Sequence, residues 1–303
     1  MSTTSPEFRS AFIALIGRPN SGKSSLLNTV LEENISIVTP MPQTTQRPVR
    51  GIYNGDGYQL VFIDTPGFHR GKHALNKSMY NLAVKIFSDA GIDILCYIVD
   101  LSRRFGREEA EIVRLVEEIK IPVCIVFNKM DLCKSVKSVT EQFYTEYPGL
   151  RQFPRVIISA VSPEAKVHFL DTIEPLLPVG PQYYPPDHIT DANLRFFAAE
   201  FIRKQIIDLT CEEVPHASCV EIEDYKEYET GHEITATIHV ETQGQKGILI
   251  GKKGSMITRI RKKAAEVLQL LTGSKVKITC HVKVSPGWRD NVQFLSSIGL
   301  RVK

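Results

Sequence analysis

The segment Gly-Arg-Pro-Asn-Ser-Gly-Lys-Ser at residues 17–24 constrains the fold more than any other feature of the chain. It follows an apolar run at 11–17 and precedes a helical pattern, so a glycine-rich turn joins a strand to a helix. Glycines let backbone N–H groups converge on one point, and the helix N-terminus adds partial positive charge there. We therefore predict a loop that binds the β-phosphate of a nucleotide. Lys23 would bridge the β- and γ-phosphates, and the Ser24 hydroxyl would bind Mg²⁺.

Short apolar runs alternate with helical patterns over residues 11–177. The later runs are continuously apolar and rich in Val and Ile, as in strands buried on both faces of a sheet. Between the runs lie helix-forming stretches such as 108–119. This alternation predicts an α/β domain over residues 1–177, with a mostly parallel sheet and helices on both faces. The candidate strands are 11–17, 50–54, 59–65, 94–100, 122–128 and 155–160.

Two further motifs end strands of this predicted sheet. Asp64-Thr-Pro-Gly67 follows the third run, where Asp64 can hold Mg²⁺ through water and Gly67 can offer a backbone N–H to the γ-phosphate. Asn128-Lys-Met-Asp131 follows the fifth run. Here Asp131 can accept the N1–H and the 2-amino group of guanine, whereas adenine would leave this carboxylate unpaired. The spacing therefore predicts a guanine nucleotide.

The remaining base contacts are assigned around the second motif. Asn128 can bond the Hoogsteen edge of the purine, and the aliphatic stem of Lys129 can cover a ring face. Ser159 and Ala160 end the sixth run, where a backbone N–H can reach the guanine O6. The order of these motifs resembles the five-box signature of the GTPase superfamily. The resemblance implies nucleotide contacts from Gly17, Asn20, Ser21, Gly22, Lys23, Ser24 and Ser25.

The threonine of the first switch is the one part of this signature that the motifs leave open. It falls within residues 39–47, where we choose Thr45 for the γ-phosphate and Mg²⁺ contact and keep Thr44 as the alternative. A loop whose order depends on the γ-phosphate would give a switch between GTP and GDP states. The predicted metal ligands are Ser24, Thr45 and Asp64. The predicted catalytic residues are Lys23, Thr45 and Gly67.

Phe68 follows the second phosphate motif, where Ras-like GTPases carry a Gln that orients the attacking water. Phe cannot orient water, so we predict that intrinsic hydrolysis is slow and that a group from outside these motifs completes the hydrolytic site. With a hydrophobic residue at this position, the chain resembles the Era and tRNA-modification branch of the superfamily. Several members of that branch hold a potassium ion partly through an Asn of the phosphate loop. Asn20 matches that position, so the resemblance implies K⁺ as a further ligand.

The segment Pro-Val-Gly-Pro-Gln-Tyr-Tyr-Pro-Pro-Asp at residues 178–187 cannot continue a helix or a central strand, because proline fixes φ and donates no amide. We place a linker at 178–190 and a second domain at 191–303. The net charge of +3 hides an asymmetry between two segments. Residues 246–303 carry 13 Lys and Arg against two acids, whereas residues 187–245 carry four basic and 13 acidic residues. The basic segment favours a polyanion as partner.

Gly-Lys-Lys-Gly at residues 251–254 lies between two helical patterns. With a helix at 191–209 and alternating stretches at 232–241 and 275–284, the order is helix, two strands, helix–GxxG–helix, strand. This order resembles the type II KH fold, an α+β domain whose glycine turn clamps the backbone of about four nucleotides of single-stranded RNA. Trp288 is a candidate stacking surface for a base, or else a packing residue. The predicted RNA-binding residues are Gly251, Lys252, Lys253, Gly254, Arg259, Lys262 and Lys263.

A GTPase motif set, a Pro-rich linker and one type II KH domain together resemble the Era family of bacterial GTPases over residues 9–300. The stretches that carry the resemblance include GRPNSGKSSLLN, TPMPQTTQR, DTPGFH, NKMD and GQKGILIGKKG. The resemblance implies a Mg²⁺-dependent GTP hydrolase that binds the 3′ end of small-subunit rRNA and acts in assembly of the 30S ribosomal subunit. It also implies a cytoplasmic monomer, with peripheral contact to the cytoplasmic face of the inner membrane reported for some relatives.

Composition fits a globular protein, with 43% hydrophobic and 23% charged residues. The six Cys lack metal or disulfide spacing, which favours a reducing compartment, and the sequence has no apolar signal core or membrane-length stretch. One alternative function is a membrane-recruited signalling GTPase whose basic segment contacts lipid, although lipid binding needs no glycine clamp. A tRNA-modification GTPase is disfavoured, because no C-terminal Cys nucleophile or cofactor domain is evident.

Overall fold

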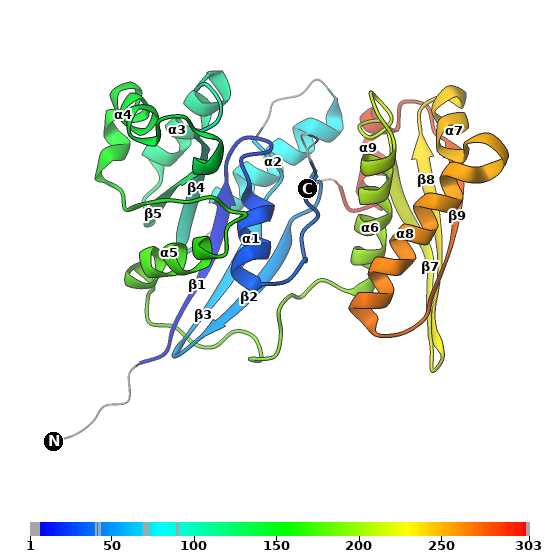
Figure 1. The fold of residues 1–303 in the computed structure, drawn as a ribbon, viewed down its shortest axis with the longest axis horizontal. Coiled ribbons are helices and arrows are strands. Elements are labelled where there is room, and N and C mark those ends of the chain that lie inside the picture. Colours follow the sequence, from blue (N-terminus) through cyan, green and yellow to red (C-terminus); the bar gives the residue numbers. More distant parts are fainter. Residues whose placement is uncertain (1–6, 40, 42–43, 69–72, 89–90, 301–303) are drawn as a thin grey trace. The chain divides into compact units, whose positions relative to one another are not determined.

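The computed structural model describes residues 7–39, 41, 44–68, 73–88 and 91–300. These residues divide into two compact units, whose helices and strands are labelled in Figure 1. The first unit extends to Asp191 and the second begins at Ala192, with residues 73–75 grouped with the second. The Pro-rich segment at 178–190 therefore belongs structurally to the first unit.

Within the described residues, a six-stranded sheet forms the centre of the first unit. Its strands are β1 (Arg9–Ile16), β2 (Val49–Gly55), β3 (Tyr58–Asp64), β4 (Ile94–Asp100), β5 (Val123–Asn128) and β6 (Arg155–Ile157). The strand order is β2-β3-β1-β4-β5-β6, in which β2 runs antiparallel to β3 and every other neighbouring pair is parallel. The predicted mostly parallel α/β sheet is confirmed. The run predicted as a strand at 155–160 leaves the sheet after Ile157, so its last residues form a loop.

Helices cover both faces of this sheet (Figure 1). They are α1 (Lys23–Leu31), α2 (Ala74–Ser88), α3 (Arg107–Glu118), α4 (Val136–Glu146) and α5 (Glu164–Ile173). α1 and α5 pack on one face, where the ring centroids of Phe62 in β3 and Phe169 in α5 lie 5.9 Å apart. α3 and α4 pack on the other, where Phe143 of α4 lies 5.3 Å from Phe127 of β5. Burial on both faces explains why β4 and β5 are apolar along their whole length.

The second unit is a three-stranded sheet with helices on one face. Its elements are α6 (Leu194–Leu209), β7 (Cys219–Tyr228), β8 (Gly231–Val240), α7 (Gln243–Ile250), α8 (Ser255–Thr272), β9 (Val276–Val284) and α9 (Val292–Ser297). β7 is antiparallel to β8, and β8 is parallel to β9. The alternation in β8 buries Ile234, Ala236, Ile238 and Val240 against the helices, as the sequence predicts. The element order confirms the predicted α+β KH arrangement.

Two features of the second unit differ from the sequence analysis. β7 has no clear alternation, because acidic residues interrupt it and its register shifts between Ile222 and Asp224, so the sequence pattern does not predict its bounds. Trp288 is 1% exposed, and its indole Nε1 donates a hydrogen bond to the Ala217 carbonyl at 3.0 Å. Trp288 is therefore a packing residue, and the stacking alternative is wrong.

The loops that follow β1, β3, β4 and β5 meet at one edge of the first sheet, because the carboxyl ends of parallel strands lie on the same side. Three of these strands end on a polar residue, namely Asp64, Asp100 and Asn128. The fold thus gathers the predicted motifs at one place. Among the described residues, no helix has both the length and the apolar character that crossing a bilayer requires.

Candidate nucleotide site and nucleic-acid interface

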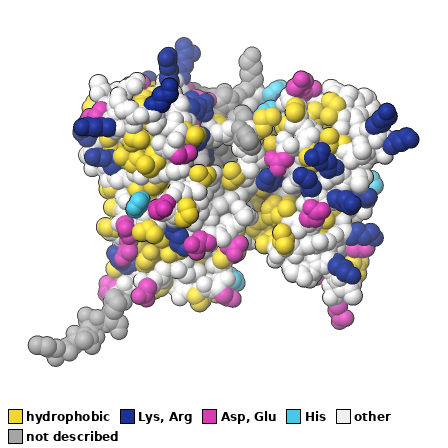
Figure 2. Space-filling view, viewed as in Figure 1, with side chains coloured by type: hydrophobic (Ala, Val, Ile, Leu, Met, Phe, Trp, Pro, Cys, Tyr) yellow, Lys and Arg dark blue, Asp and Glu magenta, His cyan; other side chains and the backbone are white. Residues whose placement is uncertain are grey.

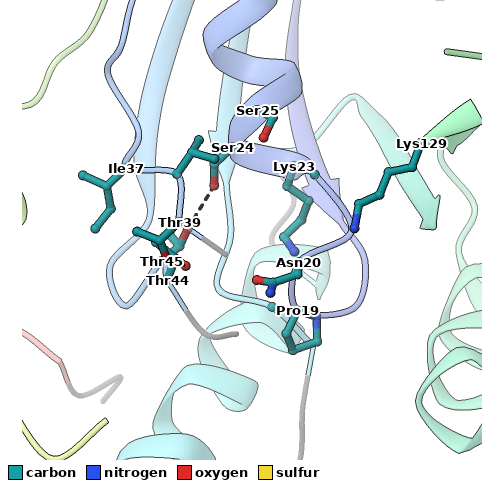
Figure 3. A pocket seen from close by; sticks show the side chains of 13 residues that line it. Pro19, Asn20, Lys23, Ser24, Ser25, Ile37, Thr39, Thr44, Thr45 and Lys129 are labelled. Carbon is teal, nitrogen blue, oxygen red and sulfur yellow. Dashed lines mark hydrogen bonds between the residues drawn. The ribbon is translucent and has the colours of Figure 1, made fainter. Parts of the chain in front are cut away.

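A cavity of about 230 Å³ lies where the first loop enters α1 (Figure 3). The side chains of Asn20, Lys23 and Thr45 point toward it, and Lys129 approaches from a neighbouring loop. It therefore brings together residues from four separate predicted motifs. The cavity is lined by Pro19, Asn20, Gly22, Lys23, Ser24, Ser25, Ile37, Val38, Thr39, Thr44, Thr45, Gly67 and Lys129.

The backbone of the first loop is held in a form that needs glycine. Gly22 precedes α1 with a φ of 98°, in the left-handed region that side chains other than glycine rarely adopt. A Cβ at Gly22 would also collide with the amide nitrogen of Asn128. That nitrogen donates a hydrogen bond of 2.8 Å to the Ser21 carbonyl, so the loop is fastened to the end of β5. The glycine therefore serves close packing as well as the turn.

Lys23 is the first residue of α1, and its side chain is buried. Its Nζ donates to the carbonyls of Gly17 at 3.2 Å and Arg18 at 3.1 Å. Burial lowers the pKa of Lys23 to about 8, an effect that the Asp64 carboxylate opposes and the nearby Lys129 ammonium reinforces. A positive group that is buried in this way is stabilised by an incoming anion.

Asp64 forms a cluster with three hydroxyl groups. Its Oδ2 accepts hydrogen bonds from Ser24 Oγ at 2.6 Å, from Ser36 Oγ at 2.6 Å and from Thr45 Oγ1 at 3.4 Å. Burial raises the pKa of Asp64, although Lys23 and these hydroxyls counteract part of the rise. Its other oxygen, Oδ1, is buried and has no hydrogen-bond partner among the described residues. An unpaired carboxylate oxygen beside the hydroxyls of Ser24 and Thr45 is the kind of oxygen donor set that Mg²⁺ prefers, so the residues present fit this ion.

The structure separates the two threonines of the first switch. Thr45 Oγ1 lies 3.1 Å from Ser24 Oγ, whereas Thr44 Oγ1 donates to the Met41 carbonyl at 2.7 Å and lies 2.8 Å from Thr39 Oγ1. The arrangement favours Thr45 as the metal-facing residue. Pro40, Pro42 and Gln43 of this loop, and His69 after the Asp64–Gly67 motif, lie outside the described residues.

The loops predicted to hold guanine are joined by Asn128. Its Oδ1 accepts the backbone N–H of Ala160 at 2.8 Å, while its Nδ2 bonds Ser21 as described above. The amide has a second N–H, so its predicted contact with the purine stays a prediction. Asp131 is exposed, and Ser159 Oγ is buried without a hydrogen-bond partner in the described part of the chain. The structure thus brings the predicted base-binding residues to one side of the phosphate loop.

Asp100 is a site residue that the sequence analysis missed. It is 1% exposed, and its Oδ2 lies 2.7 Å from Lys129 Nζ. Its Oδ1 accepts hydrogen bonds from the Ser102 backbone N–H at 2.9 Å and the Ser102 hydroxyl at 2.6 Å. Asp100 therefore fixes the side chain that was predicted to cover the base. A signal was available, because Asp100 ends its strand as Asp64 and Asn128 end theirs.

Arg18 is a second residue whose contribution was missed, although it lies inside the first motif. Its guanidinium Nη1 is 3.0 Å from Glu109 Oε2 in α3, and its Nε is 3.1 Å from Glu108 Oε2. The hydroxyl of Tyr97 donates to Glu109 Oε1 at 2.6 Å. Because the Arg18 carbonyl also accepts from Lys23, this buried network ties the phosphate loop to α3.

Phe68 lies in the hydrophobic core. It is 2% exposed, packs 4.6 Å from the ring of Tyr80, and donates its backbone N–H to the Gly17 carbonyl at 3.1 Å. Its side chain therefore points away from the cavity. This burial agrees with the expectation that this position does not orient water.

The second candidate site is the glycine turn between α7 and α8. Gly251 has a φ of 70°, and a Cβ there would lie 2.7 Å from Met256 Cβ. Lys253 also adopts a left-handed φ of 53°, which is uncommon for a residue with a side chain. Lys252 and Lys253 are both exposed. The turn thus presents two ammonium groups on a tightly folded backbone.

Basic side chains continue along α8. Arg259, Lys262 and Lys263 are exposed, and Arg259 precedes the two lysines by three and four residues, so it neighbours both of them on the helix surface. In the described part of the chain, none of them forms an ion pair with an acid. Figure 2 shows Lys and Arg side chains gathered on the face of the second unit that carries α8. Unneutralised charge beside a glycine turn is suited to a phosphate backbone.

The two sites define the chain as a P-loop GTPase unit joined to a KH unit. Comparison with known families agrees, because a model described as 50S ribosome-binding GTPase matches residues 12–129 and a KH domain model matches residues 213–289.

The chain belongs to the GTPase Era family. It is 39% identical to GTPase Era of Geotalea uraniireducens (strain Rf4), an alignment that covers 98% of this chain and 99% of the relative. GTPase Era of Geobacter metallireducens is also 39% identical, over 96% of this chain and 98% of the relative.

Two solved structures of Era resemble the chain over nearly its whole length. One is Era in complex with MgGDPNP and nucleotides 1506–1542 of 16S ribosomal RNA, with a TM-score of 0.92, 31% identity and coverage of 97% of this chain and 100% of the other. The second is a variant of Aquifex aeolicus Era bound to GDP.AlF4-, with a TM-score of 0.91, 31% identity and the same coverage.

We predict that nucleotide binding takes up a proton at alkaline pH. The Lys23 pKa of about 8 is lowered by burial, and a bound phosphate would raise it, so above pH 8 the ammonium must be re-protonated on binding. At pH 8.5, GDP binding should take up roughly 0.8 proton, and affinity should fall by up to about tenfold per pH unit above pH 8. Titration calorimetry in two buffers of different ionisation enthalpy measures the uptake. Lys23→Arg should abolish it, and equal heats in both buffers for the unaltered chain would contradict the assignment.

We predict that Asp100→Asn weakens GDP and GTP binding to the same degree. The change keeps the shape of the side chain but removes the charge that holds Lys129, a loss of about 1.5–3 kcal/mol for a charge-assisted hydrogen bond. The affinity for each nucleotide should fall roughly tenfold to a hundredfold. The ratio of the GTP affinity to the GDP affinity should not change, because Lys129 is predicted to contact the base, which both nucleotides share. Fluorescent-nucleotide displacement measures both. Ser102→Ala keeps the ion pair and is the control; an altered GTP:GDP ratio would argue against this role.

Proposed function

We propose that this GTPase is a GTP-driven switch that binds single-stranded small-subunit rRNA near its 3′ end and acts in assembly of the 30S subunit. The observation that carries the proposal is the presence, in one chain, of a phosphate cavity and an exposed basic glycine turn. The Era structure that contains both MgGDPNP and nucleotides 1506–1542 of 16S rRNA supports it.

In the first unit, the buried Lys23 and the loop amides hold the phosphates, and Asp131 reads guanine. Ser24, Thr45 and Asp64 would hold Mg²⁺, which when bound neutralises charge on the β- and γ-phosphates. The three proposed ligands are already within hydrogen-bond reach of one another, which lowers the cost of assembling the site. Relatives crystallised with MgGDPNP and GDP.AlF4- support this assignment.

Hydrolysis in this proposal depends on charge and positioning. Lys23, Thr45 and Gly67 are the proposed catalytic residues, with Gly67 offering its backbone N–H to the γ-phosphate. The burial of Phe68 supports slow intrinsic turnover, since no side chain at this position would align water. Asn20 would contribute to a potassium site, a role supported by its left-handed φ of 62° and its place in the cavity wall.

In the second unit, Gly251 to Gly254 clamp the sugar-phosphate backbone, and the basic face of α8 extends the contact. The bound nucleotide decides whether this interface holds RNA, so GTP loading favours binding and hydrolysis favours release. The protein acts as a cytoplasmic monomer on the assembling small subunit. Contact with the inner membrane, where it occurs, is peripheral.

We predict that Asp131→Asn shifts preference from guanine to xanthine nucleotides. The carboxylate accepts two hydrogens of guanine, whereas the amide both donates and accepts and so matches the 2-oxo group of xanthine. GDP affinity should fall at least about a hundredfold while XDP affinity rises. Competition binding measures both. Asp171→Asn, an exposed change on α5, is the control, and unchanged GDP affinity in Asp131→Asn would remove the assigned base contact.

We predict that the double change Lys252→Glu and Lys253→Glu weakens RNA binding by at least about tenfold while leaving GDP binding unchanged. Two phosphate contacts would become repulsive, so the slope of log affinity against log salt should also become less negative by about two. Fluorescence anisotropy with a labelled RNA of nucleotides 1506–1542 measures this. Arg114→Glu with Lys120→Glu, both exposed on the first unit, produces the same change in net charge and is the control.

The same variants decide between RNA and lipid as the polyanion. In the proposal the unaltered chain binds the RNA, and the changes at Lys252 and Lys253 weaken that binding. Tight binding to anionic phosphatidylglycerol vesicles with no RNA binding would replace the proposal with the membrane-recruited alternative. Survival of full RNA affinity in the double variant would place the interface elsewhere on the chain.

A further inference from the structure

The Pro-rich segment at the end of the first unit bonds β1 and β3 and then reaches the edge strand of the first sheet. β2 is the edge strand, and an edge strand presents unpaired backbone groups. The Ile52 backbone N–H donates to the Ile189 carbonyl at 2.8 Å, and the Thr190 hydroxyl donates to the Arg50 carbonyl at 2.7 Å. Alternate residues of β2 are therefore paired with residues that precede the RNA-binding unit.

A buried glutamine fixes the middle of this segment. Gln59 in β3 is 0% exposed, and its Oε1 accepts the backbone N–H groups of Tyr183 at 2.9 Å and Tyr184 at 3.0 Å. Its Nε2 donates to the Tyr184 carbonyl at 2.9 Å and to Asn54 Oδ1 at 2.7 Å. The amide thus supplies the donors and acceptors that another strand would supply. Because every polar atom of this buried amide is paired, the contact is rigid.

An ion pair fixes the end of the segment. Arg50 Nη1 lies 2.7 Å from Asp191 Oδ2, and the Asn54 side chain donates to the Pro186 carbonyl at 3.0 Å. Pro185 and Pro186 limit the backbone freedom of the stretch between the two anchors. The segment is therefore a stiff arm, anchored at its middle by Gln59 and at its end by Asp191, the residue that follows it.

The anchored end is close in sequence to the nucleotide site. Thr45 faces Ser24 and Asp64 in the phosphate cavity, and Arg50 follows it by only five residues, just inside β2. A shift of the switch loop at Thr45 therefore acts on the start of β2. The same short stretch of backbone carries the proposed metal contact at one end and the anchor of the arm at the other.

We propose that the contacts of the arm with β2 and β3 form a coupling surface, in which Arg50 of β2, Gln59 of β3 and Thr190 of the arm itself position the arm so that the nucleotide state is passed to the RNA-binding unit. This inference rests on the proposed function, since it requires RNA binding that depends on the nucleotide. It differs from a purely structural tether, because a tether would preserve RNA and nucleotide binding without linking them. The expected signature is therefore a loss of coupling with each separate affinity retained.

The test measures the RNA affinity of the full chain with Mg²⁺-GDPNP and with GDP, using the labelled RNA of nucleotides 1506–1542. The ratio of the two affinities is the coupling. Asp191→Asn and Thr190→Val should each reduce the ratio at least threefold, and Gln59→Leu should bring it close to one. Nucleotide affinity without RNA should change less than twofold. By reciprocity, RNA should also lose its influence on the preference between GDPNP and GDP.

Matched controls separate coupling from general damage. Glu141→Gln breaks an equally short, exposed ion pair with Arg151 elsewhere in the first unit, and Thr172→Val removes a hydroxyl that bonds the His168 carbonyl at 2.8 Å. Both should leave the coupling unchanged. Exposed ion pairs contribute little to stability, so Asp191→Asn should fold even where Gln59→Leu does not.

The outcomes distinguish this inference from the function on which it rests. If the unaltered chain binds RNA equally with GDPNP and GDP, the proposed switch fails and the coupling surface fails with it. If the unaltered chain discriminates and Asp191→Asn and Thr190→Val discriminate equally well, only the coupling surface is overturned. If Glu141→Gln also reduced the ratio of RNA affinity with GDPNP to RNA affinity with GDP, the coupling surface would be overturned as well, because the effect would then not be specific to the arm.

Discussion

Two buried charges at the mouth of α1 determine how the first unit works. The Lys23 ammonium is held by two backbone carbonyls, and Asp64 keeps a buried oxygen that has no hydrogen-bond partner in the described chain. Burying ions costs free energy unless counter-charges and hydrogen bonds compensate. A bound phosphate group supplies the counter-charge for Lys23, and a hard cation supplies the partner for the unpaired oxygen of Asp64. Folding therefore leaves the cavity in a state that ligand binding stabilises.

The sheet topology makes the phosphate and base ends of this site one mechanical unit. Asp64, Asp100 and Asn128 end three parallel strands, so their side chains reach the same edge. Asn128 bonds Ser21 of the phosphate loop and Ala160 of the last loop, while Asp100 holds the lysine that follows Asn128. A displacement of any one of these loops therefore shifts the contacts that hold the other loops. Nucleotide recognition and phosphate positioning depend on the same few buried contacts.

The sequence predicts those parts of the site whose chemistry is local. The glycine turns, their lysines and the strand-ending acids are specified by short motifs, and the structure brings them together. The sequence does not predict contacts that depend on tertiary neighbours. Ser36 gives no local sign that it bonds Asp64, and a stacking role for Trp288 stays open until its burial is known. β7 was not located because acidic residues and a bulge obscure its period.

The Pro-rich segment illustrates the same limit with a larger consequence. Its composition predicts a spacer, because proline excludes helix and central strand. An edge strand and a buried glutamine amide nevertheless supply partners for its backbone, and neither is visible from the segment itself. A spacer would let two units act independently. A docked segment instead makes Asp191 a fixed part of the first unit, so the second unit begins from a point whose position depends on β2.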